Sequence, residues 1–216
     1  MEGAHDLGGL DGFGPVVTDD GDLSHHEPWE LRAQGVAIFG LRGGMRGWIE
    51  RLDPGVYLTS PYYARWLRAA EHGAVARGLV SPDDLERWRS TFAADPNAVP
   101  PVVSDAKAVA FVETVMTSAD RLRPATNPRF AVGDRVVVRR WRDAATHHRC
   151  PRYVRGVEGR VESICGDEPV PGHEATEIAP LYTVAFASTD LWATSDEPPF
   201  TVLVDLSEPY LEAVAS

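Results

Sequence analysis

The spacing of apolar and polar residues changes near the middle of the chain. In residues 29–120, apolar positions recur every three or four residues, which predicts amphipathic helices. After residue 129 they alternate in short runs, which predicts strands. The pattern therefore predicts an α+β protein, with a helical domain followed by a β domain.

Three capping signals divide the helical part. Ser60-Pro61, Ser81-Pro82 and Ser104-Asp105 each place an N-cap residue where a helical period begins. In the first two signals, proline follows at the first position of the helix, which is the helical position most favourable to proline. The residues expected on the buried faces are Tyr63, Trp66, Leu67, Ala70, Ala74, Leu85, Trp88, Val109, Val112, Val115 and Met116.

The β part contains four runs that read as strands, within residues 130–138, 156–161, 182–186 and 200–206. A Gly-Asp turn at Gly133 leads into the first of them. Several short strands in one small domain favour a closed barrel, because closure removes exposed strand edges. We expect an SH3-like β-barrel.

The first 28 residues differ in composition from the rest. Five glycines fall between Gly3 and Gly14, which excludes a stable helix or central strand. Two interpretations remain, a disordered tail or an arm that becomes ordered against a partner. The predicted order is an arm over 1–28, a helical domain over 29–120, a linker over 121–128 and a barrel domain over 129–216.

Composition and charge narrow the function classes. The net charge of -11 over 216 residues argues against non-specific binding of nucleic acid and against anionic membrane surfaces. We see no apolar run long enough to span a membrane and no signal peptide, so we expect a cytoplasmic protein. Cys150 and Cys165 are too few for a disulfide framework.

Three stretches carry a family resemblance. They are Asp6-Leu7-Gly8-Gly9 through Gly12-Phe13-Gly14-Pro15; Arg46 through Tyr57-Leu58-Thr59-Ser60-Pro61-Tyr62-Tyr63-Ala64-Arg65-Trp66; and His147-His148-Arg149-Cys150-Pro151-Arg152-Tyr153-Val154-Arg155-Gly156 with Gly159. Tyr182-Thr183-Val184 and Leu191-Trp192 add weaker matches. In this order, and over nearly the whole chain, they resemble the nitrile hydratase beta subunit.

The resemblance implies an enzyme that hydrates nitriles to amides, active only as a heteromer. In the family, low-spin cobalt or iron is held by a cysteine claw on the alpha subunit, and Cys150 and Cys165 cannot form such a claw. The chain is therefore expected to bind no metal or other cofactor itself. Its expected partners are the alpha subunit, in an αβ heterodimer and further an α2β2 tetramer, and a small nitrile. The sequence does not distinguish cobalt from iron or identify the nitrile.

The resemblance also implies three catalytic residues. Arg46 and Arg149 would donate hydrogen bonds to the oxidised sulfur ligands of the partner's metal, a role suited to the planar, permanently charged guanidinium. Tyr62 would hydrogen-bond toward the same centre. On spacing alone, either arginine also fits a solvated surface position.

Further residues are expected around these three. Met45, Tyr63 and Trp66 would line the substrate pocket, and His147, Arg152 and Tyr153 would lie at the interface. Helical spacing fits core packing of Tyr63 and Trp66 equally well. His147 and His148 diverge if they lie on a strand, which argues against a metal site there.

One segment departs from the family pattern, and three alternatives stay open. The stretch between Glu30 and Arg46 is short and contains Gly43-Gly44, which predicts a pocket of different size. The alternatives are a thiocyanate-hydrolase-like or specialised nitrile hydratase chain, an accessory protein that delivers metal, and an SH3-like binding module. Joined helical and barrel halves argue against the first, and the intact barrel half argues against the second.

Overall fold

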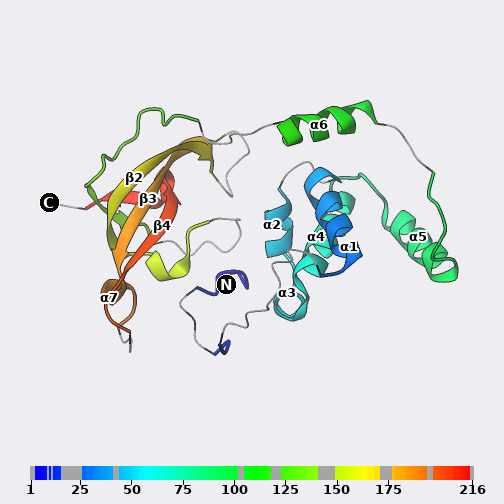
Figure 1. The fold of residues 1–216 in the computed structure, drawn as a ribbon, viewed down its shortest axis with the longest axis horizontal. Helices are drawn as coiled ribbons and strands as arrows, with labels where there is room; N and C mark the ends of the chain where they lie inside the picture. The colour runs from blue at the N-terminus through cyan, green and yellow to red at the C-terminus, as the bar shows by residue number, and fades with distance from the viewer. Residues whose placement is uncertain are drawn as a thin grey trace. The chain divides into compact units, whose positions relative to one another are not determined.

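The chain divides into two compact units in the computed structural model (Figure 1). One unit comprises Met1–Val16 and Asp120–Ser216, and the other comprises Val17–Ala119. The structure describes residues 3–8, 10, 12–15, 26–40, 44–101, 105–117, 123–140, 149–170, 177–193 and 197–214. The N-terminal segment therefore groups with the C-terminal part of the chain rather than with the helices that follow it.

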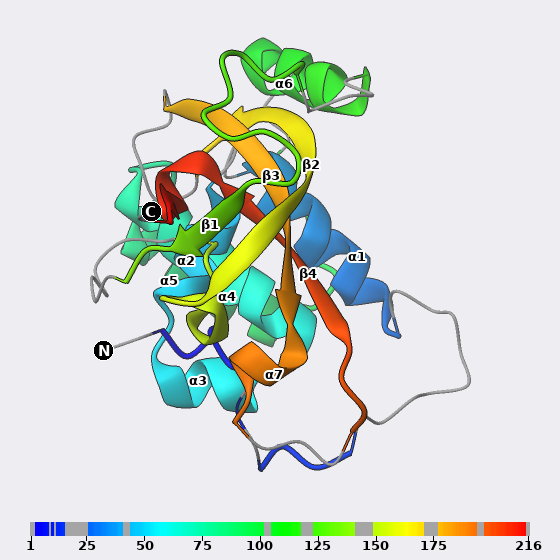
Figure 2. The same ribbon diagram turned by 90° about the vertical axis from the view of Figure 1, so that its left-hand side faces the viewer.

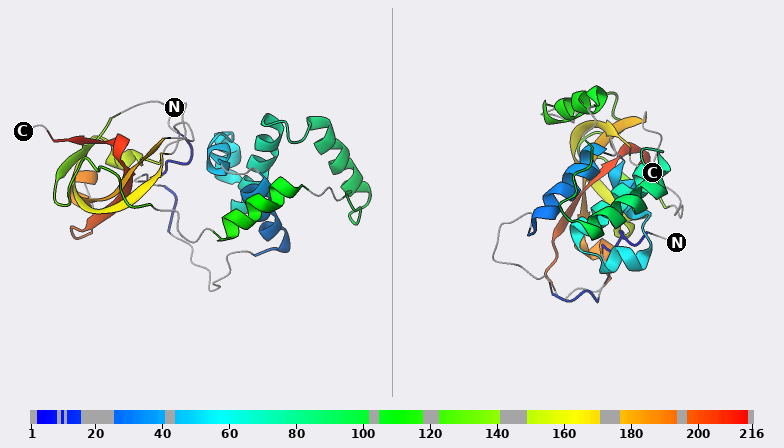
Figure 3. Two further views of the ribbon diagram at one scale, coloured as in Figure 1. Left: turned by 90° about the horizontal axis from the view of Figure 1, so that it is seen from above. Right: turned by 90° about the vertical axis from the view of Figure 1, so that its right-hand side faces the viewer.

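The second unit is helical (Figures 1 and 3). Its elements are α1 (Pro28–Gly35), the π-helical turn η1 (Val36–Gly40), α2 (Met45–Glu50), α3 (Pro54–Thr59), α4 (Tyr62–Ala76), α5 (Pro82–Ala94) and α6 (Ala106–Thr117). The elements α1, η1 and α2 all pack against α4. None of the described helices combines the length and apolar character needed to cross a membrane.

The predicted caps have different outcomes. Ser81 is an N-cap, because its Oγ accepts the Asp84 N–H at 3.0 Å while the Asp84 carboxylate accepts the Ser81 N–H at 3.4 Å. The prediction for Ser60 is wrong, because its N–H donates to the Val56 carbonyl at 3.0 Å and ends α3, so that α4 starts after Pro61. Ser104 lies outside the described residues.

The predicted buried faces are only partly buried within this chain. Tyr63 and Ala70 are buried, but Leu67 is 40% exposed and Val109 is 53% exposed. Helix α5 buries no residue, and Leu85 and Trp88 are half-buried. The side chains of Val115 and Met116 lie outside the described residues. The helical period therefore predicts more burial than the described residues of this unit show.

The other unit is built on one antiparallel sheet (Figure 2). Its strands are β1 (Arg135–Val138), β2 (Glu158–Pro169), β3 (Ile178–Ala187), β4 (Thr201–Ser207) and β5 (Leu211–Ala213), in the order β4-β3-β2-β1-β5. The short elements η2 (Arg152–Val154), α7 (Ser188–Leu191) and η3 (Glu208–Tyr210) connect them. The four predicted strands correspond to β1–β4, and β5 was missed. Over the described ranges no pairing joins β4 to β5, so the α+β class is confirmed but barrel closure is not.

The core of this unit lies on one face of the sheet. Alternate residues are buried in β1 and, from Tyr182 to Phe186, in β3, and η2, η3 and the segment before β1 pack against the same core. The most deeply buried side chains are Val136, Val138, Cys150, Val154, Val161, Tyr182, Val184, Phe186, Leu206 and Leu211.

Gly159 of β2 pairs with Val136 of β1 and lies close to residues 184–186 of β3. A Cβ atom at this position would be 2.7 Å from the side chains of Val184 and Phe186 and 2.9 Å from the Ala185 carbonyl oxygen. Because one of these neighbours is backbone in a paired strand, the site cannot relax by a rotamer change alone. The register of β2 against β3 therefore requires glycine here.

Replacing Gly159 with alanine tests this packing. We expect Gly159→Ala to lower the free energy of unfolding by about 1–3 kcal/mol, because the added methyl overpacks the strand contact. The measurement is urea unfolding followed by intrinsic fluorescence. Gly35→Ala in α1 is the control, since a Cβ there meets nothing within 4 Å. Wild-type stability in Gly159→Ala would contradict this packing.

Candidate functional site

The predicted site residues fall into two groups, one in each unit. In the helical unit, Met45 and Arg46 open α2, and Tyr62 and Tyr63 open α4. Gly44 precedes α2 with a φ of 72°, a left-handed conformation that favours glycine. Met45 is half-buried and packs against the buried Ala37 and Ala70, whereas Arg46 is exposed.

The start of α4 carries a cluster of aromatic rings. The ring centroids of Tyr62 lie 5.0 Å from Tyr63 and 5.7 Å from Trp66, and those of Tyr63 and Trp66 are 5.8 Å apart. Tyr62 is 58% exposed, whereas Tyr63 is 7% exposed. Trp66 is half-buried and packs against the same small core as Met45. Of these rings, Tyr62 presents most surface to its surroundings, and Tyr63 lies within the unit.

Arg65 supports this cluster from the same helix. Its guanidinium lies 4.8 Å from the ring centroid of Tyr57 and 5.8 Å from that of Tyr62. A guanidinium over an aromatic face is an attractive cation–π arrangement. Arg65 was not among the predicted site residues. Its guanidinium lies against the rings of both Tyr57 and Tyr62.

The second group surrounds a hollow in the β unit. The hollow has a volume of about 220 Å³ and is lined by His5, Asp6, Gly8, Arg149, Cys150, Pro151 and Tyr153. It therefore brings together Arg149 and Tyr153, both predicted, with residues of the N-terminal arm. His147 lies outside the described residues.

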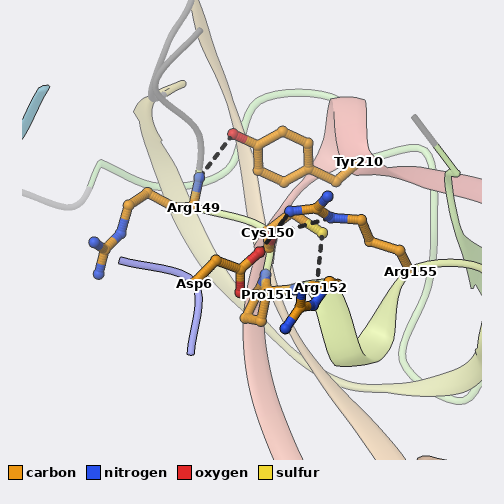
Figure 4. Close-up of polar contacts among 7 residues, drawn as sticks. All are labelled: Asp6, Arg149, Cys150, Pro151, Arg152, Arg155 and Tyr210. Carbon is orange, nitrogen blue, oxygen red and sulfur yellow. Dashed lines mark hydrogen bonds and ion pairs between the residues drawn. The ribbon is translucent and has the colours of Figure 1, made fainter. Parts of the chain in front are cut away.

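The arm is attached to this unit by the carboxylate of Asp6 (Figure 4). Its Oδ2 forms an ion pair with Nη2 of Arg155 at 2.8 Å, and both side chains are 7% exposed. Its Oδ1 accepts the backbone N–H of Arg152 at 3.0 Å. Gly8 then crosses the ring of Tyr153, where a Cβ would be 2.7 Å from a ring carbon. The Gly-rich arm thus lies close against residues 152–155 because it carries no side chain at that point.

The segment that carries Arg149 is held from several sides. The Cys150 carbonyl accepts two bonds from Arg155, from Nη2 at 3.0 Å and from Nε at 3.4 Å. The Arg149 N–H donates to the Tyr210 hydroxyl at 3.4 Å, a long bond for this type. At the far end, the Gly156 N–H donates to the Val138 carbonyl at 2.7 Å and joins the segment to β1.

The Arg149 side chain extends away from these contacts, as Figure 4 shows. The residue is exposed. Its positive charge acts on Glu168 of β2, where burial and the nearby Asp205 raise the pKa of the carboxyl and Arg149 opposes that rise. The backbone of Arg149 is thus bound to the unit while its guanidinium faces outward.

Burial keeps the neighbouring acidic groups protonated. It raises the pKa of the Cys150 thiol to about 12, with Arg155 partly opposing the shift. Burial also raises the pKa of the Tyr210 hydroxyl to about 12 and, together with the Asp6 carboxylate, raises the pKa of Tyr153. At neutral pH these groups act as neutral hydrogen-bond partners and not as anions.

The donor set of the described residues does not fit a metal. No group of three or more His, Cys, Asp or Glu side chains converges in the part of the chain that the structure describes. Cys150 is buried, and its protonated thiol is a poor ligand because metals bind the thiolate. Among the described residues of the two groups, the exposed polar side chains Arg46, Arg149 and Tyr62 can donate hydrogen bonds.

Asp6, Arg155 and Tyr210 were not among the predicted site residues. Asp6 and Arg155 stand inside two of the quoted motifs and carry opposite charges, which is the one signal that could have linked them. Tyr210 follows the last predicted strand and carried no such signal.

Comparisons with known proteins cover almost the whole chain. The family model "Nitrile hydratase beta subunit, N-terminal" matches residues 1–112, and "Nitrile hydratase beta subunit, C-terminal" matches residues 118–213. The chain is 34% identical to the low-molecular weight cobalt-containing nitrile hydratase subunit beta of Rhodococcus rhodochrous, over 98% of this chain and 99% of that protein. It is 31% identical to the cobalt-containing nitrile hydratase subunit beta of Pseudonocardia thermophila, over 99% and 97% of the two chains.

One solved structure is also similar to part of the chain. It is a recombinant apo-enzyme form of thiocyanate hydrolase from Thiobacillus thioparus, 26% identical, covering 53% of this chain and 100% of that one. The TM-score is 0.43, which is too low to define a shared fold.

The raised pKa of Cys150 predicts slow thiol chemistry. Burial penalises the thiolate, so a pKa of about 12 leaves Cys150 protonated at pH 8. In a Cys165→Ser background we expect a thiol-reactive disulfide reagent to label the native protein at least roughly 100-fold more slowly than the urea-unfolded protein. Cys150→Ser, which retains the half-buried Cys165, controls for reagent activity. Equal native and unfolded rates would contradict the assignment.

Proposed function

Because the chain belongs to the nitrile hydratase beta-subunit family, we propose that it completes a heteromeric nitrile hydratase, which adds water to a nitrile to give an amide. The observation that carries the proposal is the match of both family models, in order, to residues 1–112 and 118–213 of a single chain. An accessory protein that resembled only the helical half would not account for the second match.

The partner in this proposal is an alpha subunit that holds the metal. In this proposal the Lewis-acid chemistry comes from a metal on the other subunit, and the described residues of this chain contain no cluster of metal-binding side chains. Two of the similar proteins are named as cobalt-containing, which makes cobalt the first metal to test and iron the second.

Arg46 and Arg149 are the donors that this chain would bring to the shared site. Both are exposed within the chain, as a residue that meets a partner must be. A guanidinium offers two parallel N–H donors, which suits paired oxygens on oxidised sulfur ligands better than an ammonium does. The anchored backbone of Arg149 fixes where its side chain begins.

Tyr62 and its neighbours would form the wall of the substrate site. Tyr62 is 58% exposed and its ring is held by Tyr63, Trp66 and Arg65, which suits a hydroxyl that must point at a fixed place. Met45 and Trp66, half-buried in one cluster, would supply apolar surface for the nitrile. Tyr63, which is 7% exposed, would support the pocket by packing against the ring of Tyr62.

The remaining parts of the proposal concern assembly. His147, Arg152 and Tyr153 are placed at the subunit interface, and the arm is expected to reach the partner beyond its anchor at Asp6. We propose an αβ heterodimer that pairs into α2β2, and closure of the sheet into an SH3-like barrel. The two free thiols fit a reducing compartment such as the cytoplasm.

Conservative substitution of the arginines tests this function. The chain is co-expressed with its alpha subunit in cobalt-supplemented medium, purified through a tag on this chain and assayed for amide formation. We expect Arg46→Lys and Arg149→Lys each to lower kcat about 10–100-fold, because lysine keeps the charge but loses the paired donors.

Matched controls come from exposed arginines of the same units. Arg68→Lys in α4 and Arg160→Lys in β2 are expected to keep wild-type kcat. Recovery of this chain as a metal-free monomer, with no amide formation in the presence of the alpha subunit, would disprove the function.

A further inference from the structure

We propose that Asp6 and Arg155 form a buried latch that positions Arg149 for its role in the heteromeric site. This inference rests on the proposed function, because Asp6 and Arg155 can act as positioning residues only if Arg149 acts in the heteromeric site. Neither residue would touch the reacting atoms, so both are positioning residues.

The latch connects the N-terminal arm to two backbone groups of a segment that lies 146 residues later in the sequence. Asp6 binds the Arg152 N–H through Oδ1 at 3.0 Å and Arg155 through Oδ2 at 2.8 Å. Arg155 in turn donates to the Cys150 carbonyl at 3.0 Å. Its guanidinium thus bridges the N-terminal arm and the peptide unit between Cys150 and Pro151, one residue beyond Arg149 (Figure 4).

Charge and burial make this contact directional. Both side chains are 7% exposed, and Arg155 divides its planar donors between a carboxylate and a carbonyl. Charge-assisted bonds of this kind are shorter and stronger than neutral ones, and a guanidinium fork fixes angle as well as distance. A contact of Arg149 itself, from its backbone N–H to the Tyr210 hydroxyl, is longer at 3.4 Å. The latch therefore constrains this segment more strongly than that hydrogen bond does.

Other ion pairs of the same unit lack this arrangement. Arg139 of the segment after β1 pairs with Glu212 of β5 at 3.1 Å, but its side chain is 54% exposed and that of Glu212 is 57% exposed. Such a pair is screened by solvent and contributes little. It provides a matched control in which a carboxylate is also replaced by an amide.

The test uses the assembled, metal-loaded heteromer and measures kcat per assembled complex. We expect Asp6→Asn, which keeps the shape but removes the charge, to lower kcat about tenfold with a much smaller change in KM. Glu212→Gln is expected to keep wild-type kcat. A residue that only stabilised the fold would reduce the yield of complex without changing kcat per complex, and that result would overturn the proposal.

A double-mutant cycle links the latch to Arg149. If Asp6 acts through Arg149, then Asp6→Asn combined with Arg149→Lys should lower kcat little more than Arg149→Lys alone. Multiplicative effects of the two substitutions would overturn the proposal. Hydrogen exchange adds a readout besides activity: amides of residues 149–157 should exchange faster in Asp6→Asn, because the Arg152 N–H loses its charged acceptor.

Two further comparisons complete the test. Because Asp6→Asn leaves Arg155 buried beside a neutral group, Asp6→Asn with Arg155→Gln removes both charges, and we expect it to assemble with reduced kcat. Failure of both variants to assemble would overturn the proposal in favour of a purely structural role. If instead Arg149→Lys has wild-type kcat, the proposed function of Arg149 fails, while hydrogen exchange still reports whether the latch orders the segment.

Discussion

The ion pair between Asp6 and Arg155 is the contact on which the arrangement of the β unit at its candidate site depends. It joins the N-terminal arm to a segment almost 150 residues later, with side chains that are each 7% exposed. Removing one partner of a buried pair leaves an uncompensated charge and typically costs about 3–5 kcal/mol, whereas an exposed pair contributes about 0–1 kcal/mol. The Gly-rich arm can reach Arg155 because Gly8 allows its backbone to lie on the Tyr153 ring.

The chain separates two kinds of chemistry that the complete enzyme needs. Its described residues offer exposed arginines and a tyrosine hydroxyl, while Cys150 is protonated by burial and no metal-binding cluster forms among them. A hydrogen-bond donor is useful to a metal centre only if its backbone is fixed, because small displacements weaken such bonds steeply. In the proposed function, the network from Asp6 to Cys150 would supply that fixation for Arg149, and the packing of α2 against α4 would supply it for Arg46.

The helical unit leaves several apolar side chains exposed within this chain. Helix α5 buries no residue, although Trp88 and Phe92 place their ring centroids 5.6 Å apart on it, and Val109 of α6 is 53% exposed. Apolar faces of this kind are typical of surfaces that another chain covers. The relatives of this chain are themselves named as subunits.

The sequence by itself determined the class of each half of the chain, the places of α4, α5, α6 and β1–β4, and the family. Local rules suffice for these: a period of three to four residues for the helices, alternation for β1–β4, and the reciprocal cap at Ser81. It did not place the start of α4, because the closing turn of α3 uses Ser60 first. Only the tertiary structure decided that Asp6, Arg155 and Tyr210 converge on the segment of Arg149, because long-range pairing of charges leaves no periodic trace in a single sequence.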